Sequence, residues 1–278
     1  MVFKYDAYLV WSEQTRRELQ VMSPHTARAP IHVVGAAQFD VFFQDRFRLS
    51  RSAFCATQGL RPDRPIILYA IGSPNLLRGE RDGALDLAER LTRGELGEAQ
   101  LLVRPHPMHD TGELVPFFAK FGRSVVVQGS GADDLEFRSQ DESQTVEWVN
   151  SFRHADVVVN LSSTVAVDAA LFDRPVVNLD YDPAPDRAQQ LLVHDINHVW
   201  THFKPIAESG GVWLVRDSAE LLHAVKTYLS HPELHRAQRR WVAEYVCGYV
   251  DGRSGERTAD AILTVIRTQA GARRVHGR

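Results

Sequence analysis

The sequence predicts an α/β protein built on a doubly wound parallel sheet. After residue 60, short apolar runs rich in β-branched residues alternate with segments of helical period, as in proteins made of repeated strand–helix units. The runs lack polar alternation, which is typical of strands buried on both faces of a parallel sheet. With 278 residues, of which 44% are hydrophobic and 24% charged, the chain is long enough for a substantial core.

The strands and helices follow from this alternation. The predicted strands are Pro65–Ala70, Gln100–Val103, Ser124–Val127, Asp156–Val159, Pro175–Leu179 and Val212–Val215. The predicted helices between them are Gly83–Arg93, Gly112–Phe121, Thr145–Arg153 and Ser163–Phe172. The last part of the chain is predicted to be helical over Ser218–Ser230, Pro232–Val246 and Arg253–Thr268.

The first residues have a different pattern, which is too short to close a second domain. They predict two strands, a capped helix and a mostly helical, polar connector, at Asp6–Trp11, Ile31–Gly35, Ser12–Gln20 and Phe39–Gly59 respectively. We therefore expect residues 1–58 to be the end of an N-terminal domain with its interdomain connector. Residues 59–278 are then one α/β domain with C-terminal helices.

Composition excludes several classes of protein. The net charge of −3 gives no reason to expect nucleic acid as a partner. The two cysteines, Cys55 and Cys247, lie far apart, so neither a disulfide framework nor a structural zinc site is expected, and a reducing cytoplasm fits best. No run approaches the roughly 20 apolar residues of a membrane-spanning helix, and no signal peptide is recognisable at the N-terminus.

The most informative segment is residues 154–180, HADVVVNLSSTVAVDAALFDRPVVNLD, which reads as strand, turn, helix and strand. Ser162, Ser163 and Thr164 fall where a parallel sheet presents the positive end of a helix to an anion, so they predict a phosphate site without a glycine-rich loop. Asp168 follows within reach of a ribose hydroxyl. The alternative is structural: serines after a strand are good helix caps, and Asp168 can be an exposed helix residue.

A second candidate is His106 in the segment LLVRPHPMHD, which follows a predicted strand. Pro105 and Pro107 fix the backbone around it, at the edge of the sheet where ligands bind. A histidine there can hydrogen-bond to a phosphate, or it can pack as an ordinary loop residue. Arg104 is a further phosphate ligand or, alternatively, a cap for a neighbouring carbonyl group.

Two loops are weaker candidates. Gly72 permits close approach of the backbone and Ser73 can donate to a phosphate, although a simple turn explains both equally well. Arg253, before the last helix, either brings positive charge to a pyrophosphate or belongs to a helix start with surface ion pairs. The four-residue spacing of the histidines at 194, 198 and 202 invites a metal site, but nearby Pro205 and the aromatic residues argue against a regular helix, and we expect no metal.

Taken in order, these segments carry a family likeness that spans nearly the whole chain. The chain resembles the C-terminal, donor-binding half of GT-B glycosyltransferases, with a Rossmann-like fold. Within that group it is most similar to the CDP-glycerol glycerophosphotransferases and related capsule polysaccharide transferases. The residues that carry the resemblance are Tyr8–Ser12, Val33–Gly35, Ile67–Tyr69, Arg104–Pro107, Ala155–Asp156, Ser162–Ser163, Pro175, Asp251–Gly252 and Glu256–Arg257.

The resemblance implies transfer of a glycosyl or glycerophosphoryl group from a CDP- or UDP-linked donor to a glycan or lipid-linked acceptor of the cell envelope. His106 would contact the donor phosphates as the catalytic residue, Ser162 and Ser163 would hold them, and Asp168 would stand where related enzymes carry an acidic ribose ligand. No tightly bound cofactor is implied. The acceptor-binding domain would be supplied separately, so this chain alone is an incomplete enzyme, located in the cytoplasm or at the inner membrane face.

Two other functions remain open at this stage. A non-hydrolysing UDP-sugar epimerase shares the fold and much of the donor site, and it differs only in a poorer match to these motifs. The other alternative is a non-catalytic module that binds a nucleotide or a partner protein.

Overall fold

The computed structural model describes residues 3–77, 79–108, 111–129, 141–184 and 186–276. Contacts divide the chain into two compact units, one of Met1–Arg46 with Trp241–Arg278 and the other of Phe47–Arg240. This division differs from the predicted boundary before Gly59. The helix that precedes Gly59, α2 (Arg51–Gln58), packs against α5 (Glu142–His154) of the second unit, whereas the last helix packs against a turn in the first 46 residues.

The second unit is built on a six-stranded sheet in the order β5-β4-β3-β6-β7-β8, with every neighbouring pair parallel. Ile67 of the central strand pairs with Leu101 on one side and with Val157 on the other. This confirms the doubly wound, Rossmann-like α/β fold. The strands are β3 (Ile66–Ala70), β4 (Gln100–Arg104), β5 (Val125–Val127), β6 (Val157–Asn160), β7 (Val176–Leu179) and β8 (Trp213–Val215).

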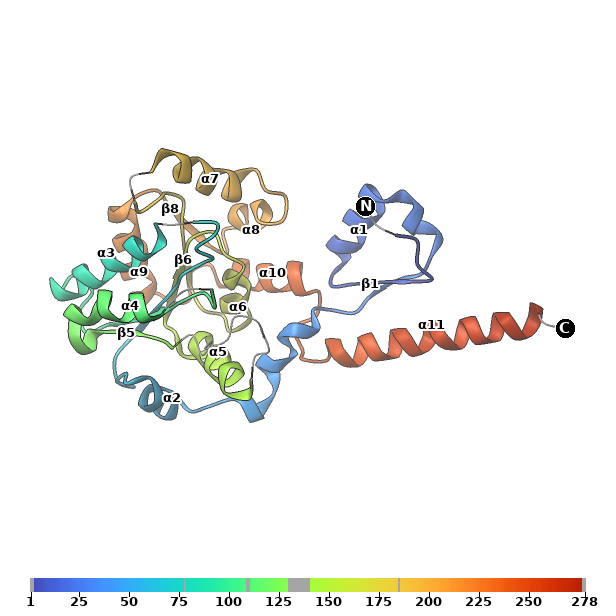
Figure 1. Cartoon of the computed structure of the whole chain (residues 1–278), viewed down its shortest axis with the longest axis horizontal. Helices are drawn as coiled ribbons and strands as arrows, with labels where there is room; N and C mark the ends of the chain where they lie inside the picture. The colour runs from blue at the N-terminus through green and yellow to red at the C-terminus, as the bar shows by residue number, and fades with distance from the viewer. Residues whose placement is uncertain (1–2, 78, 109–110, 130–140, 185, 277–278) are drawn as a thin grey trace. The chain divides into compact units, whose positions relative to one another are not determined.

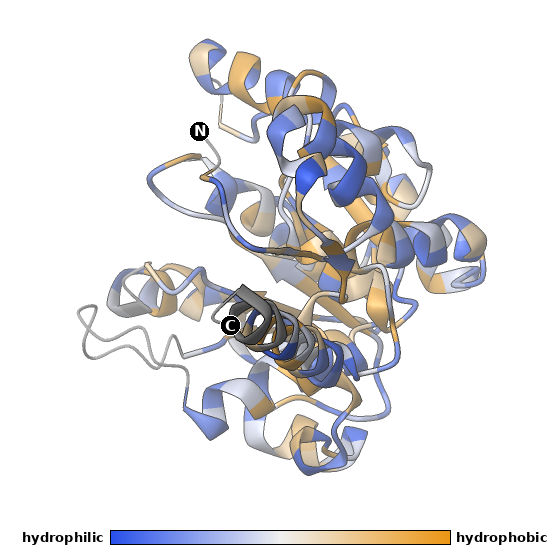
Figure 2. Cartoon of the chain, turned by 90° about the vertical axis from the view of Figure 1, so that its right-hand side faces the viewer, coloured by the Kyte–Doolittle hydropathy of each residue, from blue (hydrophilic) through white to orange (hydrophobic). Residues whose placement is uncertain are grey.

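Helices cover both faces of this sheet, which explains why its strands lack polar alternation. α3 (Glu80–Thr92) and α9 (Ser218–Ser230) contact each other over one face, while α5 and α6 (Val165–Leu171) pack together over the other (Figure 1). Every residue of β3, β6 and β7 is buried. Figure 2 accordingly shows apolar colour on the strands and mixed polar and apolar colour on the surrounding helices.

The other helices of the second unit surround the ends and edges of the sheet. α4 (Thr111–Phe118) and the 3₁₀ segment η4 (Ala119–Ser124) contact the edge strand β5. α7 (Arg187–His198) and α8 (Lys204–Glu208) follow β7 and pack against each other. α10 (Arg236–Cys247) begins in this unit and ends in the first.

Two helices start at least two residues later than predicted, and in each case a residue with a left-handed backbone lies shortly before the observed start. The helix predicted from Ser163 begins only at Val165, three residues after the turn residue Ser162 at φ 51°. The helix predicted from Pro232 begins at Arg236, directly after His235 at φ 59°. Such a conformation is incompatible with a right-handed helix.

The first unit contains a parallel pair of strands, β1 (Tyr8–Val10) and β2 (Ile31–Val33), which are shorter than predicted. α1 (Glu13–Met22) and the 3₁₀ segment η1 (Pro24–Arg28) join them. The predicted helical connector is instead made of two 3₁₀ segments, η2 (Ala37–Phe43) and η3 (Asp45–Phe47), followed by α2. α11 (Ser254–His276) continues past the predicted end at Thr268.

Asp40 of η2 fixes the start of α11. Its carboxylate oxygens accept hydrogen bonds from the backbone amides of Ser254 and Gly255, at 3.1 and 2.7 Å. These amides belong to the first turn of the helix, where no intrahelical acceptor exists, so Asp40 acts as a cap from 214 residues away in the sequence.

Candidate functional site

The candidate site lies at the carboxyl edge of the six-stranded sheet, where the direction of the strand order reverses. From β3 the chain adds β4 and β5 on one side, and it then returns to place β6, β7 and β8 on the other. In doubly wound sheets, ligands bind at such a reversal, in the crevice beyond the carboxyl ends of the two strands that flank it. The loops after β3 and β6 therefore flank the expected site, and the loop after β4 lies beside them.

Glu80 occupies this reversal point, although the sequence analysis did not single it out. Its Oε2 accepts a 2.6 Å hydrogen bond from the Gly72 amide, and a methyl group added at Gly72 would meet the same oxygen at 2.6 Å. The side chain is almost fully buried, with 1% exposure. Burial raises the pKa of Glu80 to about 8, while the backbone amides of Gly72 and Leu161 act in the opposite direction. Glu80 thus interacts with the loops after both β3 and β6.

The loops after β3 and β4 are joined through a methionine. The hydroxyl of Ser73 and the side-chain amide of Asn75 both approach the sulfur of Met108, at 4.0 and 3.8 Å. The backbone amide of Met108 in turn donates to Nδ1 of His106 at 3.2 Å. Since Nδ1 accepts this bond, the neutral imidazole carries its proton on Nε2. Ser73 and His106, predicted from separate segments, thus belong to one loop cluster.

Arg104 ends β4 and is occupied by neighbouring side chains. Its Nη1 donates to Oε1 of Gln128 at 3.0 Å and lies 3.9 Å from a carboxylate oxygen of Glu147. Burial lowers the pKa of Arg104, and Glu147 and Asp168 partly counteract this effect. The described partners of the Arg104 side chain are thus a side-chain amide and one acid, and its contact with a donor phosphate remains a prediction.

The turn after β6 is held by buried amide side chains. The Ser162 amide donates to Asn178 at 3.2 Å, and its hydroxyl donates to Asn197 at 2.9 Å. The Ser163 amide donates to Oδ1 of Asn160 at 2.9 Å. All three asparagines are fully buried. The conformation of this turn is therefore set by residues that the sequence analysis did not name.

The capping interpretation of this turn applies only in part. The hydroxyl of Ser163 accepts from the Val165 amide at 3.4 Å, whereas Thr164, the N-cap residue, makes no side-chain cap. The hydroxyl of Ser162 is used by Asn197 rather than by the helix. Donor contacts by Ser162, Ser163 and Thr164 remain predictions.

Asp168 is not an exposed helix residue, contrary to the structural alternative. It is 6% exposed, and its Oδ1 has no hydrogen-bond partner within the described residues. Burial raises the pKa of Asp168 to about 8, and the opposing influence is Arg104. The two predicted residues Arg104 and Asp168 are thus electrostatically coupled.

Arg253 belongs to the first unit, in the loop before α11. Its Nε donates to Glu256 at 2.8 Å and its side chain is 67% exposed. Arg257 pairs with Asp251 in the same loop. These are the surface ion pairs of the structural alternative, and the contact of Arg253 with a pyrophosphate remains a prediction.

The three histidines at four-residue spacing do not converge on a metal. α7 carries His194 and His198 in a regular helix, contrary to the prediction, but ends before His202. Nε2 of His198 lies 2.9 Å from Oδ2 of Asp180, whose other oxygen accepts from Asn197. Across the described ranges, no three metal-binding side chains are grouped so that they could hold an ion. No helix in these ranges is both long and apolar enough to cross a bilayer.

Solved structures share this architecture at low sequence identity. The wall teichoic acid polymerase TagF, in crystals soaked with CDPG, aligns with a TM-score of 0.58 and 15% identity over 96% of this chain and 58% of its own. UDP-GlcNAc 2-epimerase from Neisseria meningitidis, bound to UDP-GlcNAc, aligns with a TM-score of 0.59 and 11% identity over 93% and 61%. The chain thus spans less than two thirds of either structure. At these identities the likeness concerns the fold alone.

The family itself is established by sequence. No protein with a curated description matches the chain. Residues 2–264, nearly the whole chain, match the family described as CDP-glycerol:poly(glycerophosphate) glycerophosphotransferase. The resemblance in the ordered motifs is thereby confirmed, and the chain belongs to the CDP-glycerol:poly(glycerophosphate) glycerophosphotransferase family.

Proposed function

We propose that this chain is the donor-binding half of a transferase that moves a glycerophosphoryl group from CDP-glycerol to a glycan acceptor of the cell envelope. The observation that carries the proposal is the loop cluster at the reversal of the strand order, where Gly72, Ser73 and His106 come together. Nucleotide phosphates bind at this position in doubly wound folds. Membership of the family supports CDP-glycerol as the donor.

In the proposed reaction, this half of the enzyme binds the donor and stabilises the leaving group. An acceptor hydroxyl attacks the phosphorus that bears glycerol, the bond from that phosphorus to the bridging oxygen breaks, and CMP leaves with the electron pair. Nε2–H of His106 is suited to donate a hydrogen bond to the developing charge on the leaving phosphate. The hydroxyl of Ser73 adds a further polar group beside it. The proton of the acceptor goes to a base outside this set of residues.

The place of action is part of the proposal. Cys55 and Cys247 form no disulfide with each other, as expected for a protein kept in a reducing compartment. A cytoplasmic location at the inner face of the membrane would give access both to a nucleotide-linked donor and to a lipid-linked acceptor. The acceptor-binding part would be a further domain or a separate subunit.

An epimerase-like function is the second candidate. It is favoured by the similarity to the Neisseria meningitidis epimerase, whose TM-score equals that of TagF within 0.01. That protein was crystallised with UDP-GlcNAc, so the two candidates differ in the nucleotide base that this chain should prefer.

Calorimetric titration of the chain with CDP-glycerol, CDP, UDP and UDP-GlcNAc tests the proposal. We expect selective binding of the cytidine compounds, weakened about tenfold in His106→Ala because one hydrogen bond to a charged phosphate is lost. His194→Ala, which removes an exposed histidine from α7, is the matched control and should bind normally. Selective binding of uridine compounds would favour the epimerase-like function. Equal affinity of His106→Ala and the native chain would refute the role of His106.

A further inference from the structure

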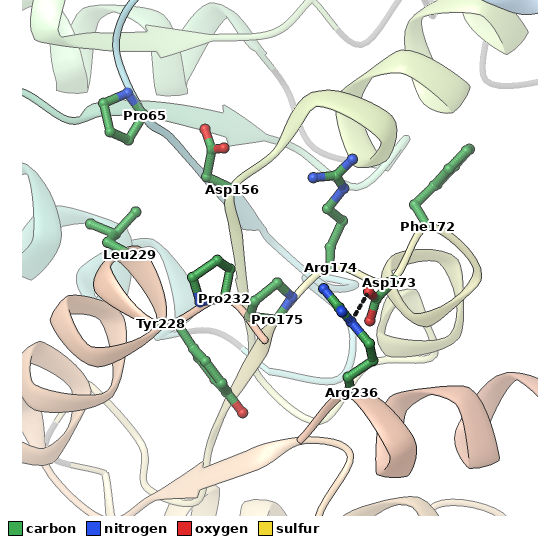
Figure 3. A pocket seen from close by; sticks show the side chains of 10 residues that line it. All are labelled: Pro65, Asp156, Phe172, Asp173, Arg174, Pro175, Tyr228, Leu229, Pro232 and Arg236. Atoms are coloured by element: carbon green, nitrogen blue, oxygen red, sulfur yellow. Dashed lines mark hydrogen bonds and ion pairs between the residues drawn. The ribbon is translucent and has the colours of Figure 1, made fainter. Parts of the chain in front are cut away.

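A pocket that shares no residue with the loop cluster opens at the amino edge of the same sheet (Figure 3). Its volume is about 320 Å³. Pro65, Asp156 and Pro175 come from the residues directly before β3, β6 and β7, and the C-terminal end of α9 supplies a further wall. Because these residues precede their strands, the pocket lies at the opposite end of the sheet from the proposed donor site.

Both carboxylates that line this pocket are already paired with arginines. Oδ2 of Asp156 binds Arg51 at 2.8 Å and also accepts from the Ile66 amide. Asp173 binds Arg236 through one oxygen at 2.7 Å and Arg239 through the other at 2.8 Å. Arg51, Arg236 and Arg239 together carry three positive charges, whereas Asp156 and Asp173 carry two negative charges. These side chains therefore leave an excess of positive charge at this edge of the sheet.

Arg174 adds a further cation, which forms no hydrogen bond with the part of the chain that the structure describes. Within the described residues its guanidinium makes no hydrogen bond or ion pair, and its Nε is closed off from solvent. Figure 3 shows the group pointing away from the Asp173–Arg236 pair and toward Asp156. Burial lowers the pKa of Arg174; Asp156 and Asp173 counteract this effect, while Arg51 adds to it. A half-buried guanidinium that lines a pocket and makes no hydrogen bond to any described carboxylate favours an anionic ligand.

We propose that this pocket binds the phosphate group of a small organic phosphate, with Arg174 as its ligand. The planar guanidinium matches two phosphate oxygens, and the unpartnered group gives up no existing bond when it binds them. The walls formed by Pro65, Phe172 and Pro175 are apolar and would receive the organic part of the ligand. The volume is at the small end for ligand pockets, which favours a compact molecule over a polymer.

The Nε–Hε signal of Arg174 in a ¹H–¹⁵N NMR spectrum tests this site directly, once it is assigned by its loss in Arg174→Lys. We expect a saturable shift of this signal on titration with glycerol 3-phosphate and a weaker effect of inorganic phosphate, because inorganic phosphate lacks the organic part. Arg174→Gln should weaken the binding of glycerol 3-phosphate by about tenfold or more. Because this variant lacks the Arg174 signal, its binding is measured from the shifts of the backbone amides around the pocket. Arg123→Gln, at an exposed arginine, should leave it unchanged.

The same titration in His106→Ala separates this pocket from the donor site. The shift at Arg174 should persist there, whether or not donor binding is lost. A signal that does not move with either phosphate would overturn the proposal, as would equal binding by Arg174→Gln and the native chain. Since Arg174 makes no hydrogen bond to a described residue, we expect Arg174→Gln to fold, and its thermal midpoint should rise less with added phosphate than that of the native chain.

Discussion

The carboxylate of Glu80 lies 2.6 Å from the backbone amide of Gly72, at the point where the strand order of the sheet reverses. The pair connects the first turn of α3 to the loop after β3, and the same carboxylate interacts with the amide of Leu161 after β6. Because the side chain is buried, its protonation state and its contacts are coupled, and both influence the loops that flank the proposed donor site.

Stability should fall as the pH rises from about 4 to 8. Burial raises the pKa values of Glu80 and Asp168 from 4.5 and 3.8 to about 8, so the folded chain holds protons that the unfolded chain has already released. This stabilisation is fully present when the pH lies below the pKa that the groups have in the unfolded chain. It is lost as the pH rises to the pKa that they have in the folded chain. Glu80→Gln removes one of these groups, so its stability relative to the native chain should increase by about 3 kcal/mol between pH 5 and pH 8.

Urea unfolding at several pH values measures this difference. Glu89→Gln on the same helix, where the glutamate is exposed, should give a curve parallel to that of the native chain. A Glu80→Gln curve that is also parallel would mean that Glu80 is ionised throughout this range.

Gly72→Ala should destabilise the second unit by about 1–3 kcal/mol, because the added methyl group would meet Oε2 of Glu80 at 2.6 Å. In a Glu80→Ala background this oxygen is gone, so the cost should fall by at least about 1 kcal/mol, a coupling that a double-mutant cycle measures. Gly129→Ala is the control, since a methyl group there meets no atom of the described residues within 4 Å. Additive effects of the two substitutions would argue against the contact.

Ser162 allows its hydroxyl and its backbone to be tested separately. Ser162→Ala removes the hydrogen bond to Asn197 and keeps the left-handed backbone at φ 51°, so it should cost about 1 kcal/mol. Ser162→Gly removes the same bond but relieves the backbone, and it should be more stable than the alanine variant by about 1 kcal/mol. Thermal unfolding compares the two variants with Ser230→Ala, at an exposed serine. A glycine variant less stable than the alanine variant would contradict this account.

Asp40→Ala should loosen the start of α11. The amides of Ser254 and Gly255 lose their acceptor, which should cost about 1 kcal/mol and speed amide hydrogen exchange in the first turn of the helix. Asp260→Ala, on the exposed side of the same helix, should leave that exchange unchanged. Equal exchange in the two variants would show that water replaces Asp40 without cost.

The strands could be predicted from the sequence because the signal is strong and local. β3 and β7 lie within one residue of the predicted Pro65–Ala70 and Pro175–Leu179, since uninterrupted apolar runs are required wherever helices cover both faces. Helix starts were harder to predict, because Ser162 and His235 have positive φ angles and their side chains bond to Asn197 and Tyr228, which lie outside the turns themselves.

The candidate site was predictable only in outline. His106 and Ser73 were found because proline and glycine residues mark the loops that carry them. Glu80 was missed, since a carboxylate in the first turn of a helix ordinarily indicates a favourable interaction with the helix dipole. Asn178 and Asn197 were missed because their role depends on where β7 and α7 lie relative to Ser162, which no local pattern encodes.

The pairing of β3 with β6 has a consequence for the order of folding. Ile66 and Asp156, joined by a 2.8 Å hydrogen bond at the start of this pair, are 90 residues apart in the sequence. Closing so long a loop is slow, and it must precede the meeting of the Gly72 and Leu161 loops around Glu80. During synthesis, β3, β4 and β5 can associate early as successive neighbours. The Leu161 loop can join the loop cluster only after β6 has left the ribosome. The proposed donor site therefore forms late during synthesis of the chain.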